Sequence, residues 1–397
     1  MPVEGPATLG SALTMARQFR AEVRAAKAKT EAARHRPAIV SALDDPVVSA
    51  AVDHKPLDKM MNSDRSITVE QNFPLSRVRA HRRMAAEADV GKYEGESGKA
   101  LLKVQAEAAQ AFFMLHERRR MAALVQKQHG LAAQLVTMAA GRHAIGAASQ
   151  LDVLRAEVER ARLRNRLAVS AADIRSAEAM FNTAVGLPPG SPVPDLDLED
   201  QFERIARIPH LGPALEEALT HHPGVQVSKA EIRRARAEVD VMKSMYAPMA
   251  MAMVRFGMAD TMTAGRGYML MVGVSVPIWF DRLKAGVGEA RAMQSMAEAD
   301  REAMLTMIQG DVVSTLETLR GAAASYSTFG TDLIPRAERA IGPAMAEYAS
   351  GRVPLASVFE AARALWSAQE EQVMAEAAMG LAWVRLRSAL GSFGVPD

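Results

Sequence analysis

The sequence predicts a mainly α-helical protein with a small β component, built from two tandem copies of one unit. Two observations support this prediction. Segments in the first half of the 397 residues recur in the second half at a nearly constant spacing. Long stretches rich in Ala, Glu and Arg also carry apolar residues at helical intervals, a pattern typical of long helices packed on one another. Each copy is expected to run helix, strand, strand, long helix, shorter helix.

The repeat is clearest in the second half of each copy. The segment that begins at Gly146 matches the segment that begins at Gly351, at a spacing of 205 positions. Gly186 and Gly391 keep the same spacing without a gap, and each ends an Ala-x-Gly triplet. A spacing that persists through a turn and a whole helix indicates a duplication rather than chance similarity.

Nearer the start of each copy the spacing shortens to 203 positions, between Pro74 and Pro277 of two strand-like segments. The repeat therefore divides the chain into a first copy at 1–190, a connector rich in Pro and Asp at 191–210, and a second copy at 211–397.

Within each copy the elements follow from local patterns. Pro223 is expected to kink or divide the helix that opens the second copy. Strands rich in β-branched and other apolar residues are expected at about 46–54, 66–74, 247–258 and 267–278. Helical hairpins are expected at about 79–186 and 283–391, with three glycines, Gly91, Gly95 and Gly98, weakening the first long helix.

The expected strands are very apolar for a sheet in water. Residues 249–256 carry one charged side chain, Arg255, and aromatic residues lie near the strand ends. An isolated four-stranded sheet has two unpaired edges. Closing several chains into a transmembrane β-barrel removes the edges and gives the apolar face to lipid. On the strands alone, a hairpin buried in an ordinary α+β domain is an equally good interpretation.

Composition excludes several functions. The net charge of +2 argues against a nucleic-acid binder, and the absence of Cys excludes a disulfide scaffold, a cysteine zinc site and a thiol nucleophile. No phosphate loop, Ser/His/Asp arrangement or His-Glu-x-x-His motif is present, so we expect neither an enzyme nor a cofactor. The first residues lack a secretory signal pattern, which by itself favours the cytoplasm.

Met249, Met251 and Met253 alternate, so one face of the predicted strand carries all three. Thioethers are soft ligands suited to Cu(I) or Ag(I), and these residues are candidates for a soft-metal path. The competing interpretation is that Met is a flexible apolar side chain on a lipid-facing or packed surface. The 25 methionines spread over the chain favour that interpretation, and no firm metal site is predicted.

Several segments resemble the TolC-like outer-membrane efflux factors, with some features of the heavy-metal branch. They are the Phe-Pro-Leu at 73–75 and the Val-Pro-Ile at 276–278 that end strands before a basic helix, the segment at 179–189, and the helix start at 218–225. These elements occur in order in both copies, and the resemblance covers about residues 9–391.

The resemblance implies a homotrimer whose chains form a 12-stranded β-barrel, continued by an α-helical coiled-coil tunnel in the periplasm, with the connector in an equatorial region. It also implies an outer-membrane channel that passively conducts its substrate, such as copper, silver or other heavy-metal cations. The implied partners are a periplasmic membrane-fusion adaptor, an inner-membrane pump of the RND type and outer-membrane lipid.

The turns between the hairpin helices would then be periplasmic tips that contact the adaptor, and carboxylates near them would form a gate. The implied tip residues are Gly146, Asp152, Val153, Leu154, Gly351, Val358 and Phe359. The implied gate residues are Asp152 and Glu360, because the second copy has Ser357 where the family usually has Asp.

Two alternatives without channel activity remain open from the residues themselves. The first is a soluble coiled-coil scaffold, which the helical composition and the missing signal favour. The second is a soluble Met-rich metal-binding protein that uses the Met-bearing hairpin. Insertion into the outer membrane distinguishes the channel from the scaffold. Metal titration of Met→Leu variants tests the metal-binding protein.

Overall fold

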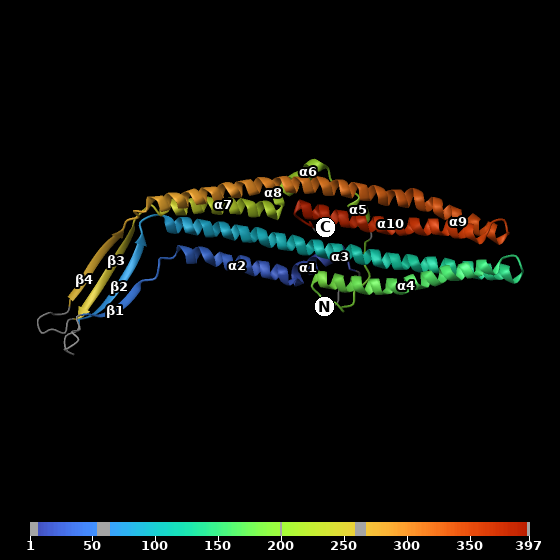
Figure 1. Cartoon of the computed structure of the whole chain (residues 1–397), viewed down its shortest axis with the longest axis horizontal. Coiled ribbons are helices and arrows are strands. Elements are labelled where there is room, and N and C mark those ends of the chain that lie inside the picture. The colour runs from blue at the N-terminus through green and yellow to red at the C-terminus, as the bar shows by residue number, and fades with distance from the viewer. Residues whose placement is uncertain (1–6, 54–63, 199–200, 259–266, 395–397) are drawn as a thin grey trace. The chain divides into compact units, whose positions relative to one another are not determined.

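The computed structural model describes residues 7–53, 64–198, 201–258 and 267–394 (Figure 1). The chain forms two compact units, and each combines segments from both sequence repeats. Unit 1 contains residues 1–25, 98–222 and 306–397, and unit 2 contains residues 26–97 and 223–305. The compact units are a division by contacts in space, whereas the two repeats and the connector are a division by sequence that stays a prediction.

The order of the elements confirms the predicted repeat of helix, strand, strand, long helix and shorter helix. The first copy comprises α1 (Leu9–Phe19), α2 (Ala21–Ser41), β1 (Val47–Asp53), β2 (Asp64–Pro74), α3 (Val78–Ala144) and α4 (Gln150–Val185). The second comprises α6 (Leu211–His221), α7 (Pro223–Ser244), β3 (Met249–Met258), β4 (Gly267–Ser275), α8 (Phe280–Thr328), the π-helical turn η1 (Phe329–Leu333), α9 (Ile334–Ala349) and α10 (Leu355–Leu390).

Two local details differ from the sequence prediction. Strand β4 ends at Ser275 rather than near 278. The long helix of the second copy is interrupted by η1, which has no counterpart in α3. A π-turn takes up an extra residue, so it accounts for one of the two positions by which the repeat spacing grows between the strands, at 203, and the hairpin turn, at 205.

The connector is packed into unit 1. The guanidinium of Arg119 on α3 donates hydrogen bonds to the carbonyl oxygens of Pro194 and Val193, at 2.7 and 3.1 Å. The short helix α5 (Gln201–Ile205) buries Phe202, whose ring centroid lies 6.0 Å from that of Phe113. The connector is thus anchored by polar contacts at one end and by aromatic packing at the other.

The four strands of unit 2 form one antiparallel sheet in the order β1-β2-β3-β4. The pairing of β2 with β3 joins the two sequence copies, with Ile67 opposite Phe256 and Glu70 opposite Met253. Strands β1 and β4 have no neighbour on their outer sides within the described part of the chain. The sheet therefore presents two edges whose backbone groups are available for pairing.

Helix α3 is continuous over 67 residues, about 100 Å, despite the glycines expected to weaken it. A Cβ added to Gly95 would lie 2.7 Å from Cγ2 of Val227 on α7. Glycine at this position lets the two helix backbones approach closely within unit 2, and this packing offsets its poor helix propensity.

The two copies end in the same way. Gly186 and Gly391 terminate α4 and α10 in the left-handed conformation, with φ of 85° and 87°. A Cβ on Gly186 would lie 2.9 Å from the carbonyl carbon of Phe19, and one on Gly391 would lie 2.5 Å from Cα of His222. Each glycine thus contacts the junction between the first two helices of its own copy.

We expect Gly391→Ala to lower the free energy of unfolding by about 2 kcal/mol or more, because a side chain is strained at positive φ and meets backbone here. Thermal unfolding followed by circular dichroism measures the effect. Gly130→Ala is the matched control: a Cβ there has open space in the interior of α3, so the variant should be more stable by about 1 kcal/mol. Equal effects of the two substitutions would contradict this interpretation.

Candidate functional site

The strand register sorts the side chains of the sheet onto two faces. One, the apolar face, carries Val48, Ala50, Val52, Ile67, Val69, Phe73, Ala250, Ala252, Val254, Phe256, Tyr268, Leu270, Val272 and Val274, together with Arg65 and Gln71. The opposite face, the polar face, carries Ser49, Thr68, Glu70, Asn72, Arg255 and Ser275, together with methionines of β3 and β4.

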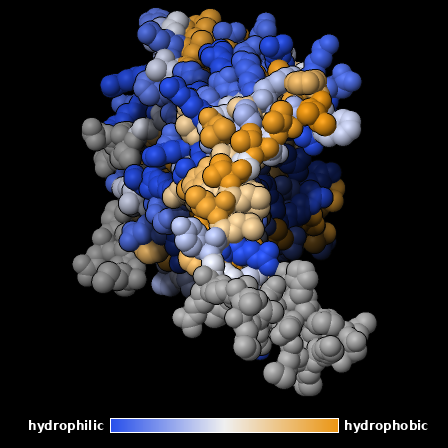
Figure 2. All heavy atoms as spheres, turned by 90° about the vertical axis from the view of Figure 1, so that its left-hand side faces the viewer, coloured by the Kyte–Doolittle hydropathy of each residue, from blue (hydrophilic) through white to orange (hydrophobic). Residues whose placement is uncertain are grey.

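The apolar face is strongly exposed within the chain. The exposed fraction is 72% for Val272 and 67% for both Leu270 and Val48. Hydrophobic side chains gather in one patch on the side of the molecule shown in Figure 2. Soluble proteins rarely expose so large an apolar patch, whereas strands that alternate between lipid and an aqueous lumen show this division of faces.

The register places Met249, Met251 and Met253 on the polar face, not on the apolar one. Met269 and Met271 of β4 share this face, opposite Arg255 and Met253 respectively. The alternation of Met249, Met251 and Met253 along β3 does not group the methionines of β4 with them. That grouping depends on the register between two strands, which alternation within one strand does not reveal.

The second candidate region is the pair of turns that end the helical hairpins in unit 1. Gly146 and Gly351 take positive φ values of 72° and 80°, so each turn depends on a left-handed residue. Ser149 caps α4, because its Oγ accepts a hydrogen bond from the backbone N–H of Asp152 at 3.2 Å. Both turns thus stand where the sequence predicted the tips.

The predicted tip residues do not all face outward. Val358 is fully buried and Phe359 is 6% exposed, in a cluster that joins the two hairpins and that Val153 also contacts. Leu154, in contrast, is 49% exposed. Two further exposed apolar side chains, Ile145 and Leu151, flank the first turn and were not singled out from the sequence.

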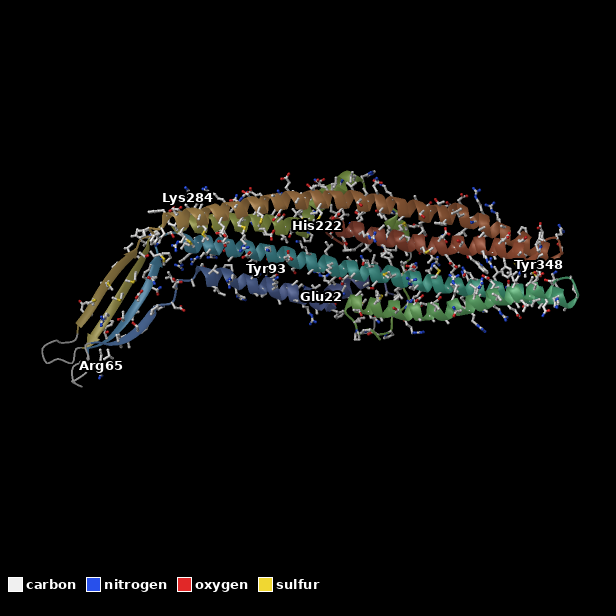
Figure 3. All side chains as sticks on the ribbon, in the orientation of Figure 1. Glu22, Arg65, Tyr93, His222, Lys284 and Tyr348 are labelled. Carbon is white, nitrogen blue, oxygen red and sulfur yellow. The ribbon has the colours of Figure 1, made fainter. Side chains whose placement is uncertain are left out.

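Arg142 and Tyr348 connect the two turns. Tyr348 lies near the end of the helical hairpins (Figure 3). The Arg142 guanidinium lies over the Tyr348 ring, 4.7 Å from its centroid, and donates a hydrogen bond to the carbonyl oxygen of Ala147 at 3.0 Å. Burial raises the pKa of Tyr348, and the negative charge of Asp152 raises it further. Asp152 therefore lies close to this pair, whereas Glu360 is exposed on α10.

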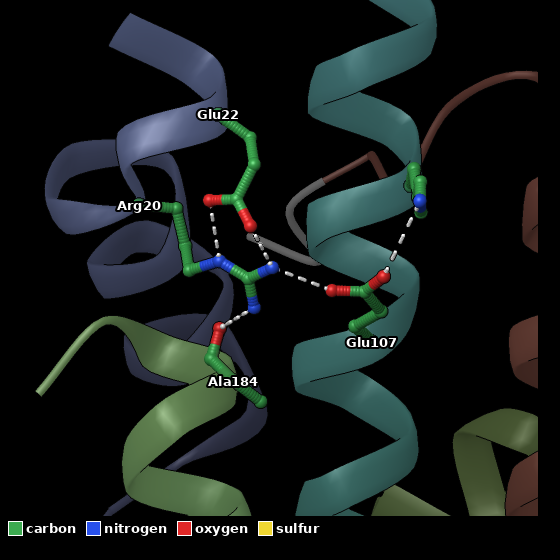
Figure 4. A network of polar contacts seen from close by, with 5 residues as sticks. Arg20, Glu22, Glu107 and Ala184 are labelled. Carbon is green, nitrogen blue, oxygen red and sulfur yellow. Dashed lines mark hydrogen bonds and ion pairs between the residues drawn. The ribbon is translucent and has the colours of Figure 1, made fainter.

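A polar network holds the helix ends of the first copy together. The Arg20 guanidinium pairs with Glu107 of α3 at 2.7 Å and donates to the carbonyl oxygen of Ala184 at 3.1 Å (Figure 4). It also binds Glu22, and this hydrogen bond lowers the pKa of Glu22 to about 2. Arg20 thus joins three helices at the junction between α1 and α2.

The second copy has a titratable residue at the equivalent junction. His222 follows α6 as Arg20 follows α1, and each donates its backbone N–H to the residue four positions earlier. Burial lowers the pKa of His222, Lys99 lowers it further, and Asp311 partly opposes both. A permanent cation in one copy is therefore replaced in the other by a titratable imidazole whose pKa lies below its ordinary value.

The lowered pKa of His222 makes the folded chain less stable in acid. The unfolded chain binds the proton more readily, so the stabilising contribution is complete above the ordinary pKa of 6.5 and is lost as the pH falls below it. We expect His222→Gln to reduce the decrease in the thermal unfolding midpoint between pH 7.5 and pH 5. His35→Gln, which changes a side chain that is 73% exposed, is the control and should leave the decrease unchanged. An unaltered pH dependence in the His222 variant would contradict this assignment.

Within the described residues, no helix combines the length and apolar character needed to cross a membrane. Residues 214–392 match the family model of the outer membrane efflux proteins. The chain is 25% identical to the cobalt-zinc-cadmium resistance protein CzcC of Cupriavidus metallidurans, over 92% of this chain and 85% of that protein. It is 24% identical to the outer membrane efflux protein BepC of Brucella suis, over 72% of this chain and 62% of that protein.

Solved structures have the same fold at low sequence identity. CusC matches with a TM-score of 0.83 at 13% identity, over 97% of this chain and 92% of CusC. The outer membrane protein VceC of Vibrio cholerae matches with a TM-score of 0.80 at 16% identity, over 97% of this chain and 96% of VceC.

Proposed function

We propose that this chain, which belongs to the TolC-like outer membrane efflux family, is the exit channel of an efflux system that includes an inner-membrane pump and a periplasmic adaptor. The observation that carries the proposal is the division of the sheet into an exposed apolar face and a polar face. In a soluble scaffold such a large exposed apolar face would contact water and favour aggregation.

Three copies of the chain would close the sheet into a 12-stranded barrel. The edges β1 and β4 lack partners within the described part of one chain, so β1 of one copy can pair with β4 of the next. Strands β2, β3 and β4 contain 11, 10 and 9 residues, about the length that a tilted strand needs to cross a bilayer. The apolar face then contacts lipid, and the polar face lines the lumen.

The hairpin turns are the proposed adaptor-binding surface. Leu151, Leu154 and Ile145 present exposed apolar side chains beside the turn at Gly146. The buried Val358 and Phe359 instead hold the two hairpins together. Asp152, close to Arg142 and Tyr348, remains the better gate candidate, because this cluster joins both turns and a change in its charge would affect both.

Heavy-metal cations are the proposed cargo. The support is the similarity to a protein named for cobalt, zinc and cadmium resistance, which extends over most of both chains. The channel itself would perform no chemistry on the cation. Its contribution is a polar path across the membrane, with the energy for transport supplied by the pump.

The two-faced sheet predicts that neighbouring residues of β4 respond oppositely to a charge. Leu270→Arg places a cation on the lipid side, which costs about 2–4 kcal/mol near the bilayer midplane, so we expect little trimer in the outer membrane. Met271→Arg places the same cation on the lumen side, in the row that holds Glu70, and should be tolerated. Quantifying trimers in outer-membrane fractions measures both. Equal loss in the two variants, or greater loss for Met271→Arg, would refute the proposed channel.

The hairpin ends predict a second contrast. Leu154→Asp changes an exposed side chain, so the thermal unfolding midpoint should stay unchanged while crosslinking to a periplasmic adaptor expressed with the chain is lost. Val358→Asp buries a charge in the cluster between the hairpins and should lower the midpoint strongly. Full adaptor crosslinking by Leu154→Asp would show that the tip contact lies elsewhere.

A further inference from the structure

We propose that the polar face of the sheet contains a binding site for a soft monovalent cation, Cu(I) or Ag(I), formed by the thioethers of Met251, Met253 and Met271. Met249 and Met269 extend the same row of methionines along β3 and β4. The inference deepens the proposed function and depends on it in one respect: the polar face lines a lumen only if the sheet closes into a barrel.

The strand register brings the sulfur ligands together. Met253 and Met271 lie directly opposite each other, and the Cβ atoms of such a pair are about 4.5–5.5 Å apart. Their side chains leave the same face, so both sulfur atoms can reach one ion between the strands. The backbone of the two paired strands fixes where these two side chains begin, so only their side-chain torsions have to be ordered when an ion binds.

Met251 supplies the third thioether. It lies two residues from Met253 on β3 and opposite Gly273 on β4. A Cβ added to Gly273 would lie 3.0 Å from Cε of Met251, so the Met251 methyl group occupies the space over this glycine. The side chain therefore extends across to β4, next to the position of Met271. Glycine at 273 makes this crossing possible.

The surrounding charges disfavour a divalent cation, and the thioether ligands favour a soft one. Glu70 lies opposite Met253 on β2 and places one carboxylate in the same row as Met253 and Met271. Arg255 occupies the adjacent row, opposite Met269, and disfavours divalent cations most. No group of three or more His, Cys, Asp or Glu residues that could hold a metal occurs in the described ranges. Neutral thioethers bind Cu(I) and Ag(I) through the polarisable sulfur, so they select these ions over Zn²⁺ or Co²⁺.

The distribution of methionines argues against simple filling of an apolar surface. All five methionines of β3 and β4 whose side chains the structure describes occupy polar-face positions. Met as a lipid-facing side chain would belong on the other face. In a trimer the row would occur three times around one lumen, and several weak sites in sequence are what conduction of an ion requires.

The test is Ag(I) binding to the full-length trimer in lipid nanodiscs, measured as bound silver per chain, with X-ray absorption to identify sulfur ligands. The double variant Met253→Leu/Met271→Leu conserves side-chain volume and removes two thioethers. We expect its affinity for Ag(I) to fall at least about tenfold. The control, Met293→Leu/Met296→Leu, changes two methionines on α8 that are 52% and 54% exposed and should bind Ag(I) like the unmodified chain.

Two further measurements make the outcomes distinct. Zn²⁺ titration should show no binding that depends on Met253 and Met271. Absence of Ag(I) binding by the unmodified trimer, or an equal loss in the strand and helix variants, would overturn the site. Conductance in planar bilayers tests the channel independently: a conducting trimer without the silver site leaves the proposed function standing, whereas absence of trimers and conductance refutes the proposed function itself.

Discussion

The hydrogen-bond register between β2 and β3 is the constraint on which the rest of the structure depends. It joins the two sequence copies into one sheet and determines which side chains share a face. A shift by one residue would move every apolar side chain of one copy to the face that carries Glu70 and Arg255. The division into an apolar and a polar face, and therefore the proposed channel, exists only in the observed register.

The duplication provides two hairpins of similar length but lets the copies diverge where they meet other elements. Arg20 and His222 occupy the same place after the first helix of each copy, yet one forms a fixed ion pair with Glu107 and the other is a partly buried, titratable group. The terminal glycines, in contrast, keep the same conformation because each contacts backbone or Cα atoms that cannot move aside. Close backbone contacts are thus preserved between the copies, and side-chain electrostatics are not.

Much of the fold could be predicted from the sequence because the signals are local. Pro74 ends β2, Pro277 follows the end of β4 by two residues, and Gly146 and Gly351 lie in the turns of the hairpins. Contacts between distant segments could not be predicted in this way. The opposition of Met253 and Met271 requires the strand register, the burial of Val358 requires the pairing of two hairpins, and the approach of Arg142 to Tyr348 requires both turns to meet. The extra residue taken up by η1 appears in the sequence only as part of a change in repeat spacing.

In the proposed channel, one face of the sheet contacts lipid and the other lines an aqueous lumen. Because the chain has no Cys, single cysteines can be introduced at Leu270 and Val272 on the apolar face, and at Met269 and Met271 on the polar face, and spin-labelled. Electron paramagnetic resonance of the trimer in bilayers then measures collision with oxygen, which concentrates in lipid, and with a water-soluble nickel chelate. We expect frequent collision with oxygen for the labels at 270 and 272, and frequent collision with the chelate for the labels at 269 and 271. The same accessibility at all four positions would contradict the proposed channel.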